Sequence, residues 1–126
     1  MNRAPTNTTH FQYLIINASS LLIAFVSAGI VDLLFPIKAK TAYHAQAVGA
    51  DIFKFLANHG SGSVSWDYKS AVKGAIKMGQ PISLDLKLCA RPYMGFETFC
   101  LHWTPLKDEQ GLVAFVVLTL GNERRA

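Results

Sequence analysis

The last third of the chain contains three apolar segments, each bounded by residues that form turns. The segments are ISLDLKLC at 82–89, FETFCLHW at 96–103 and LVAFVVLTL at 112–120. In the first, an apolar residue occupies every second position from Ile82 to Leu88, which is the period of a half-buried strand. The short connections contain Gly95 and Gly111 and favour antiparallel neighbours. The sequence therefore predicts a three-stranded antiparallel meander, whose apolar face the upstream residues must cover.

The final strand is apolar on both of its faces, which is typical of a strand covered on both sides. We therefore expect it to lie centrally and to pair with 96–103. Helices would cover one face, and a protein partner, the N-terminal segment or a second copy of the chain would cover the other. We expect the middle strand to end at Thr104-Pro105, because proline cannot donate a hydrogen bond to a ladder.

The upstream residues alternate between compact apolar runs and helix formers. Ser27 and Ser65 are suited to cap helices, and Gly79 followed by Pro81 is a typical helix end. The expected elements are strands at 11–16 and 21–26, short helices at 27–34, 38–48 and 51–57, and a longer helix from 65 to 79. The longer helix has an apolar stripe at Val72, Ala75 and Ile76. Lys69, Lys73 and Lys77 form a basic ridge beside it, which we interpret as a solvated face.

A chain of 126 residues has room for one domain with a core of its own. Two strands, several helices and three further strands indicate an α+β domain, with a five-stranded antiparallel sheet and the helices on one face. We expect a flexible segment at 1–10, the domain at 11–121 and a tail at 122–126. No nucleotide-binding, triad or paired-carboxylate motif is visible, so we expect no enzyme.

Residues 21–37 raise a competing interpretation, because they are apolar and close to the length of a membrane span. A secretory signal is also open, since Arg3 precedes an apolar run. Asp32 lies inside the stretch, however, and would cost about 2.5 to 3.5 kcal/mol at a bilayer centre. A strand followed by a short helix is the better account. The expectation is a cytoplasmic protein without a membrane partner.

Net charge and cysteine content further limit the classes of partner and ligand that we expect. The net charge of +4 is mild, and Trp66, Phe96 and Trp103 are better explained as core or interface residues than as a nucleic-acid platform. Nucleic acid is therefore not an expected partner. Cys89 and Cys100 lie inside predicted strands at a spacing that fits no metal motif, which favours buried reduced thiols over a disulfide.

The order of elements is that of the PAS domain, and four segments resemble its light-oxygen-voltage (LOV) type. IAFVSAGIVDLLFP at 23–36 is similar to the second strand and following helix, and GADIFKFL at 49–56 takes the place of the signature GRNCRFLQ. VKGAIKMGQPISLDLKL at 72–88 resembles the long helix and third strand, and LHWTPLKDEQGLVAFVVLTL at 101–120 resembles the final hairpin. The resemblance spans about 11–121. It implies a PAS fold and a sensory or protein-interaction role in intracellular signalling.

The chain departs from the LOV pattern where that family holds its flavin. The resemblance places Phe53 at the position of the photoactive cysteine, and Leu88 or Cys89, Phe99 and Leu120 at the polar flavin-holding positions. A flavin edge against these groups would leave its polar atoms unpaired, at about 1–3 kcal/mol each. We therefore expect no cofactor and no flavin photochemistry. We expect an apolar pocket lined by Phe53, Leu56, Leu88, Cys89, Phe99, Leu101, Leu118 and Leu120.

The sequence thus favours a PAS-type sensory or interaction module that associates through its sheet face, most simply as a homodimer. Two alternatives remain open at this point. One is a small-ligand or haem sensor, for which His44, His59 and His102 are candidate ligands, although solvent-facing histidines explain them more simply. The other is a LOV-type protein that binds FMN or FAD without forming the thiol adduct.

Overall fold

The computed structural model describes residues 12–34, 47–60, 64–91 and 95–121. Within these ranges the strands form one antiparallel sheet in the order β2-β1-β5-β4-β3. The strands are β1 (Tyr13–Asn17), β2 (Ile23–Val26), β3 (Ile82–Arg91), β4 (Gly95–Lys107) and β5 (Val113–Gly121). The helices are α1 (Ala28–Leu34), α3 (Ile52–Asn58) and α4 (Trp66–Met78).

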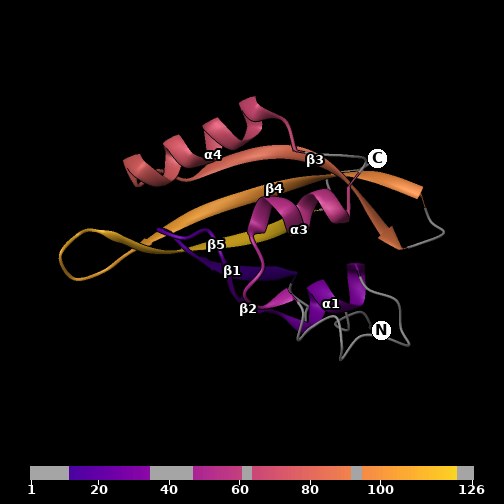
Figure 1. Ribbon diagram of the computed structural model, residues 1–126, viewed down its shortest axis with the longest axis horizontal. Coiled ribbons are helices and arrows are strands. Elements are labelled where there is room, and N and C mark those ends of the chain that lie inside the picture. The colour runs from indigo at the N-terminus through magenta and orange to yellow at the C-terminus, as the bar shows by residue number, and fades with distance from the viewer. Residues whose placement is uncertain (1–11, 35–46, 61–63, 92–94, 122–126) are drawn as a thin grey trace, which may run out of the picture.

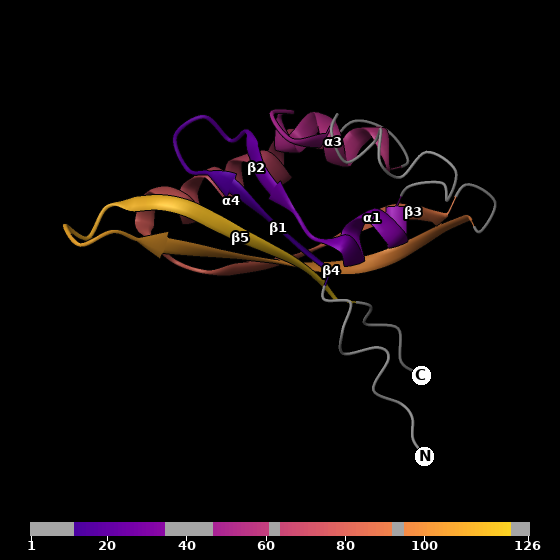
Figure 2. The same ribbon diagram turned by 90° about the horizontal axis from the view of Figure 1, so that it is seen from below.

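All described helices lie on one side of the sheet (Figure 1, Figure 2). We call the side toward the helices the inner face and the opposite side the outer face. In Figure 2 the outer face carries no described helix or strand. This arrangement confirms the predicted α+β class, with a five-stranded antiparallel sheet and helices on one face.

The central position of β5 also confirms the prediction from its apolar character. β5 pairs with β1 on one side and with β4 on the other. Its inner-face residues Val116, Leu118 and Leu120 are buried. The register places Leu118 opposite both Leu14 and Trp103, so three adjacent strands contribute to one apolar layer.

Proline does not end the middle strand, so this expectation was wrong. β4 continues through Pro105, which pairs with Val116 of β5, as far as Lys107. The pairing of β4 with β3 reaches only to Trp103. Beyond that residue β4 has a described neighbour on one side only, and proline is tolerated at such an edge.

Polar side chains begin the helices as the sequence indicates. The Asp51 carboxylate accepts hydrogen bonds from the backbone N–H groups of Phe53 (2.9 Å) and Lys54 (3.1 Å) at the start of α3. Ser65 accepts from the Tyr68 N–H (3.1 Å) at the start of α4. Ser27 accepts from the Ile30 N–H (3.3 Å) in the first turn of α1. Each cap satisfies backbone donors that have no partner inside the helix.

Several predictions concern residues outside the described ranges. They are the flexible segment at 1–10, the tail at 122–126 and most of the helix at 38–48. The apolar stretch that suggested a membrane span forms β2 and α1 as far as residue 34. No helix in the described part of the chain is long and apolar enough to cross a membrane.

Two glycines of the α4 region provide a matched stability test. Gly79 caps the helix with φ +69°, and a β-carbon there would lie 2.8 Å from Cε of Lys107, whereas one at Gly74 would meet nothing within 4 Å. We expect Gly79→Ala to lower the free energy of unfolding by about 1–2 kcal/mol, because an L-residue is strained in the left-handed region. Gly74→Ala should raise it by about 0.5–1 kcal/mol, because alanine is the better helix former.

Urea denaturation of both variants checks this pair of expectations. Equal shifts in the two unfolding free energies would contradict the role assigned to the left-handed cap.

Candidate functional site

Helix α3 crosses the inner face of the sheet and is held near both ends. At its start, the Ile52 N–H donates to the Leu21 carbonyl (2.9 Å), next to β2. At its end, the His59 carbonyl accepts from the Cys89 N–H on β3 (2.6 Å). β2 and β3 are the two edge strands. The helix is therefore fixed above the space in which the sequence predicts a pocket.

Most of the residues predicted to line the pocket are placed around this space. Seven of the eight are buried, with at most 7% of each side chain exposed, and belong to one core cluster. They are Phe53, Leu56, Leu88, Phe99, Leu101, Leu118 and Leu120.

Cys89 is placed elsewhere. It is half-buried and lies outside the core cluster. Successive residues of a strand alternate between faces, so its side chain projects to the outer face while that of Leu88 projects inward. Cys100 is also half-buried, and the two cysteines are not joined by a disulfide.

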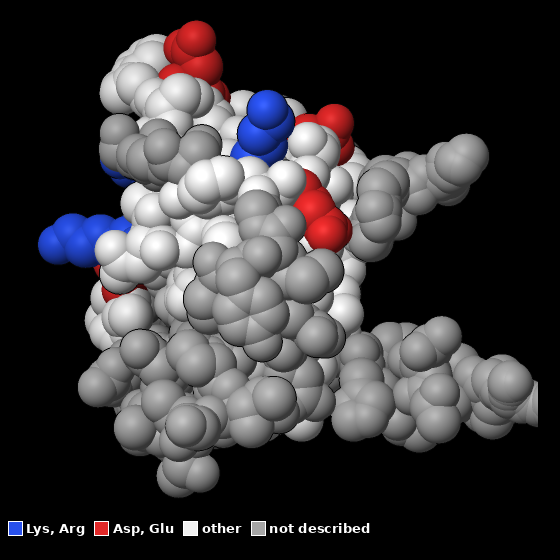
Figure 3. Space-filling view, turned by 90° about the vertical axis from the view of Figure 1, so that its right-hand side faces the viewer, with Lys and Arg blue, Asp and Glu red and all other residues white. Residues whose placement is uncertain are grey.

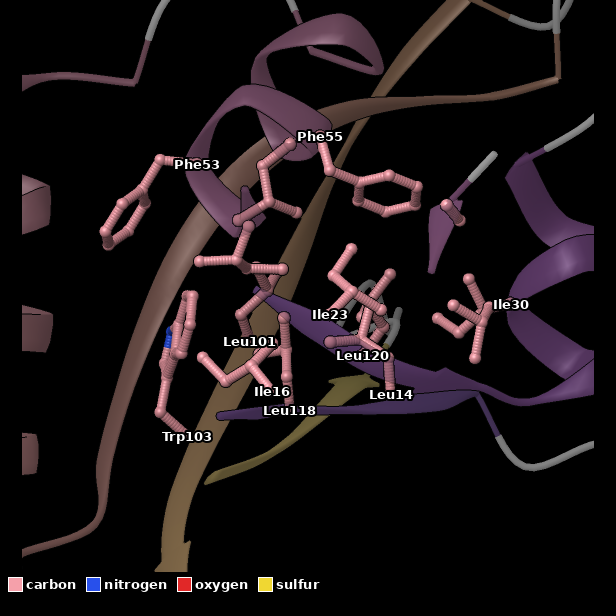
Figure 4. Packing of buried hydrophobic residues seen from close by; sticks show 14 of the residues in the cluster. Leu14, Ile16, Ile23, Ile30, Phe53, Phe55, Leu101, Trp103, Leu118 and Leu120 are labelled. Carbon is pink, nitrogen blue, oxygen red and sulfur yellow. The ribbon is translucent and has the colours of Figure 1, made fainter. Parts of the chain in front are cut away.

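Three aromatic side chains occupy the region between α3, α4 and β4, and we refer to them as the aromatic cluster: Phe53, Tyr68 and Trp103. The ring centroids of Phe53 and Trp103 are 6.0 Å apart, and those of Tyr68 and Trp103 are 6.3 Å apart with an edge-on geometry. In Figure 4 Phe53 lies near Trp103, while Phe55 points to the other side of α3. Trp103 is 1% exposed. The cluster fills the part of the inner face nearest α4.

The polar atoms of the aromatic cluster have partners within it or next to it. Nε1 of Trp103 donates to the Tyr68 hydroxyl (3.4 Å), and that hydroxyl donates to the Leu84 carbonyl (3.5 Å). Burial raises the pKa of Tyr68 to about 12, so the hydroxyl keeps its proton at neutral pH. Burying an indole or a phenol requires such partners, and here both groups are satisfied inside the fold.

Three flavin-holding positions of the LOV resemblance carry apolar side chains here. Leu88, Phe99 and Leu120, where the LOV resemblance expects polar side chains, are buried and offer no hydrogen-bond donor. Glu97 pairs with Leu88 across the strands and is half-buried. Its side chain lies on the same face of the sheet as that of Leu88, because directly opposite residues of paired strands project to the same face.

Neither of the two described histidines, His59 and His102, belongs to the buried cluster under α3. The His59 ring packs against Phe55 at a centroid distance of 4.8 Å, and burial lowers its pKa. Nδ1 of His102 lies 2.6 Å from Oγ of Ser83 and 4.0 Å from Sγ of Cys100, on the outer face. His44 lies outside the described residues. Among the described residues no group of three or more His, Cys, Asp or Glu could hold a metal ion.

The outer face presents a second candidate site, because it exposes large apolar side chains. The exposed fraction is 42% for Phe25, 40% for Phe115 and 44% for Leu106. Tyr13 stacks on Phe25 with ring centroids 5.7 Å apart. Cross-strand pairing makes these positions continuous: Ile15 lies opposite both Phe25 and Val117, and Leu106 lies opposite Phe115. We call this surface the outer apolar patch: Tyr13, Ile15, Phe25, Leu106, Phe115 and Val117.

Among the described residues visible in Figure 3, side chains of both charge signs occur. On the outer face, the polar positions belong mainly to β3, where Ser83, Asp85 and Lys87 are exposed. The outer face therefore changes from polar at β3 to apolar at β5, β1 and β2.

Comparison with known proteins identifies the fold. No protein-family model matches the chain, and no curated protein matches it in sequence. Solved structures do match in shape. One is a LOV domain from a study of its mechanism with a flavin analogue, with a TM-score of 0.69 and 15% identity over 94% of this chain and 82% of that one.

Two further structures match as well. The light-state structure of the aureochrome1 LOV photoreceptor has a TM-score of 0.67 and 15% identity over 97% of this chain and 91% of that one. The PAS domain of the fruit-fly ELK potassium channel has the same TM-score and identity over 98% of this chain and 100% of that one. This chain has the PAS fold. Identities this low show the PAS fold and nothing about ligands.

Two residues in the interior of this PAS fold were not predicted to line the pocket. Trp103 follows Leu101 by two residues, so the alternation of β4 puts both on the inner face. Tyr68 precedes Val72 and Ile76 at intervals of four, so it falls on the buried stripe of α4. Both spacings are visible in the sequence, whereas the flavin-holding positions of the LOV resemblance include neither residue.

The aromatic cluster can be tested by removing Phe53. We expect Phe53→Ala to lower the free energy of unfolding by about 3–5 kcal/mol, because the lost ring leaves a cavity beside Trp103. The cavity should be dry and apolar, so benzene should raise the melting temperature of the variant and not that of the parent protein. Trp66→Ala is the control, since Trp66 is 77% exposed and its loss should cost less than about 0.5 kcal/mol.

Differential scanning calorimetry with and without benzene measures both effects. A Phe53→Ala protein as stable as the parent would mean that Phe53 does not pack in the core.

Proposed function

We propose that the chain is a PAS-type sensory or protein-interaction module that binds a protein partner through the outer apolar patch. The partner we favour is a second copy of the same chain. The module acts by binding rather than by catalysis, in the cytoplasm, and without a flavin.

The observation that supports this proposal is the exposure of the outer apolar patch. Phe25, Leu106 and Phe115 are each at least 40% exposed, and they belong to neighbouring strands of one sheet. Solvent-exposed aromatic and aliphatic side chains that form one continuous surface are typical of protein interaction sites. Aromatic residues are also enriched in the centres of interfaces.

A second copy suits the patch because both copies would present the same surface. Most oligomers of identical chains have two-fold symmetry, in which a self-complementary patch packs on itself. The patch consists of apolar side chains and contains no charged group, so two copies can face each other without repulsion between like charges. The polar β3 side of the sheet would then lie at the rim.

Without a flavin, this PAS domain would not be a photoreceptor. Two features of the inner face support this part of the proposal. The aromatic cluster occupies the space near α4, and the flavin-holding positions are apolar. A change in the inner face would have to reach the outer face through the sheet itself, because β4 and β5 have side chains on both.

The association proposal is tested by charging the centre of the patch. We expect the parent protein to sediment as a dimer at about 100 μM and Phe115→Glu to sediment as a monomer of 13.8 kDa, because the interface would have to bury a carboxylate. Met78→Glu is the matched control, since Met78 is 71% exposed on α4 and the change in charge is the same. Sedimentation velocity measures all three.

A parent protein that remains monomeric at that concentration would contradict the homodimer, and the patch would then need a different protein partner.

The cofactor proposal is tested with light. We expect the purified protein to show no flavin absorption, and we expect Phe53→Cys mixed with flavin mononucleotide to show no bleaching of the blue absorption band under illumination. The physical reason is that a thiol at residue 53 has no flavin held beside it. Absorption spectra before and after illumination provide the measurement. Reversible bleaching would show that the inner face holds a flavin after all.

A further inference from the structure

A groove lies between the turn that joins β1 to β2 and the C-terminal half of α4. Its lining residues are Ala18, Ser19, Leu21, Lys73, Ile76 and Lys77, and its volume is about 370 Å³. Figures 1 and 2 both place this turn beside α4 on the helical side of the molecule. The groove therefore lies on the side of the sheet opposite to the outer apolar patch.

The groove has an apolar floor and a fixed wall. Leu21 and Ile76 pack with the core, and Ile76 is 8% exposed. The backbone of Leu21 has φ +63°, an unusual conformation for leucine. Hydrogen bonds hold it there: its N–H donates to the Asn17 carbonyl (2.8 Å), and its carbonyl accepts from the Ile52 N–H (2.9 Å). These two hydrogen bonds stabilise the conformation of the turn.

Two lysines of the basic ridge on α4 line this groove, although the sequence predicted only a solvated face there. Lys73 and Lys77 are exposed and stand one helical turn apart on α4. Among the described residues no acidic side chain forms an ion pair with either of them. The groove therefore combines an apolar floor with two cationic groups that have no described counterion.

The cationic side of the groove continues along α4 to an exposed tryptophan. Trp66, Lys73 and Lys77 are spaced by seven and four residues, which places them on one side of the helix. The helix rises about 1.5 Å per residue, so this stripe is roughly 16 Å long. Trp66 is 77% exposed at the far end. A surface of this length exceeds what a small ligand in the groove would need.

We propose that the groove and the α4 stripe bind an acidic segment of a partner protein. One apolar side chain of the segment enters the groove over Leu21 and Ile76. Its carboxylates face Lys73 and Lys77, and a further side chain packs on Trp66. This complementarity of charge and shape favours a peptide, since a flat bilayer would not use a concave groove and the few lysines of α4 offer little to a phosphate backbone.

The probe for the experiment is a fluorescein-labelled peptide of alternating glutamate and leucine, compared with a version in which glutamine replaces each glutamate. Fluorescence anisotropy measures binding to the intact protein. We expect the glutamate peptide to bind at least about tenfold more tightly than the glutamine peptide. Its affinity should also fall as salt concentration rises, because the exposed lysines are screened.

Matched charge variants locate the site. Lys73→Gln with Lys77→Gln should weaken binding by about tenfold, while Lys54→Gln with Lys87→Gln, two exposed lysines elsewhere, should change it by less than about twofold. Ser19→Trp should also weaken binding, because it fills the groove without changing the charge. Phe115→Glu should leave peptide binding unchanged, which separates this proposal from the dimer proposal.

Three results would overturn the inference. The first is an equal loss of affinity in both double-lysine variants, which would indicate attraction to the net charge alone. The second is tighter binding to phosphatidylserine vesicles or to a single-stranded oligonucleotide than to the peptide, with the same dependence on Lys73 and Lys77. The third is the absence of measurable peptide binding at 100 μM protein.

Discussion

The structure depends on how a short helix is held across the inner face of the sheet. α3 has only seven residues, too few to be stable alone, so its position comes from its neighbours. Hydrogen bonds join its ends to the two edges of the sheet, at Leu21 and at Cys89, and four of its side chains are buried below it. The packing of Phe53 against Trp103 follows from that placement.

The same placement makes the two faces of the sheet different in kind. The inner face is buried by α1, α3 and α4, and the polar atoms of the aromatic cluster are satisfied internally through Tyr68 and the Leu84 carbonyl. The outer face has no described element above it and exposes aromatic rings. In many ligand-binding folds the residues of the interior determine which ligand binds. Here the large exposed apolar side chains of the sheet lie on the outer face. This contrast is why the proposals concern partners rather than cofactors.

The sequence predicted the structure correctly wherever a residue type favours one local conformation. Alternation revealed the inner face of β3, Ser27 and Ser65 marked the starts of α1 and α4, and Gly79 marked the end of α4. It predicted less where the pairing of neighbouring strands determines the structure. Pro105 was expected to end β4, and only the pairing of β3 shows that this proline lies at an edge. Cys89 could not be separated from Leu88 by alignment, although the alternation of β3 separates them in space.

Pro105 also affects how the sheet meets other chains. Beyond Trp103, β4 extends past the last pair that it forms with β3, so one side of the β4–β5 ribbon has no described strand beside it. An open strand edge of this kind can recruit a strand from another molecule and start aggregation. Proline removes one backbone donor from this stretch, and Lys107 adds a charge two residues later. Edge-to-edge growth of the sheet is thereby discouraged, and association is left to its broad outer face.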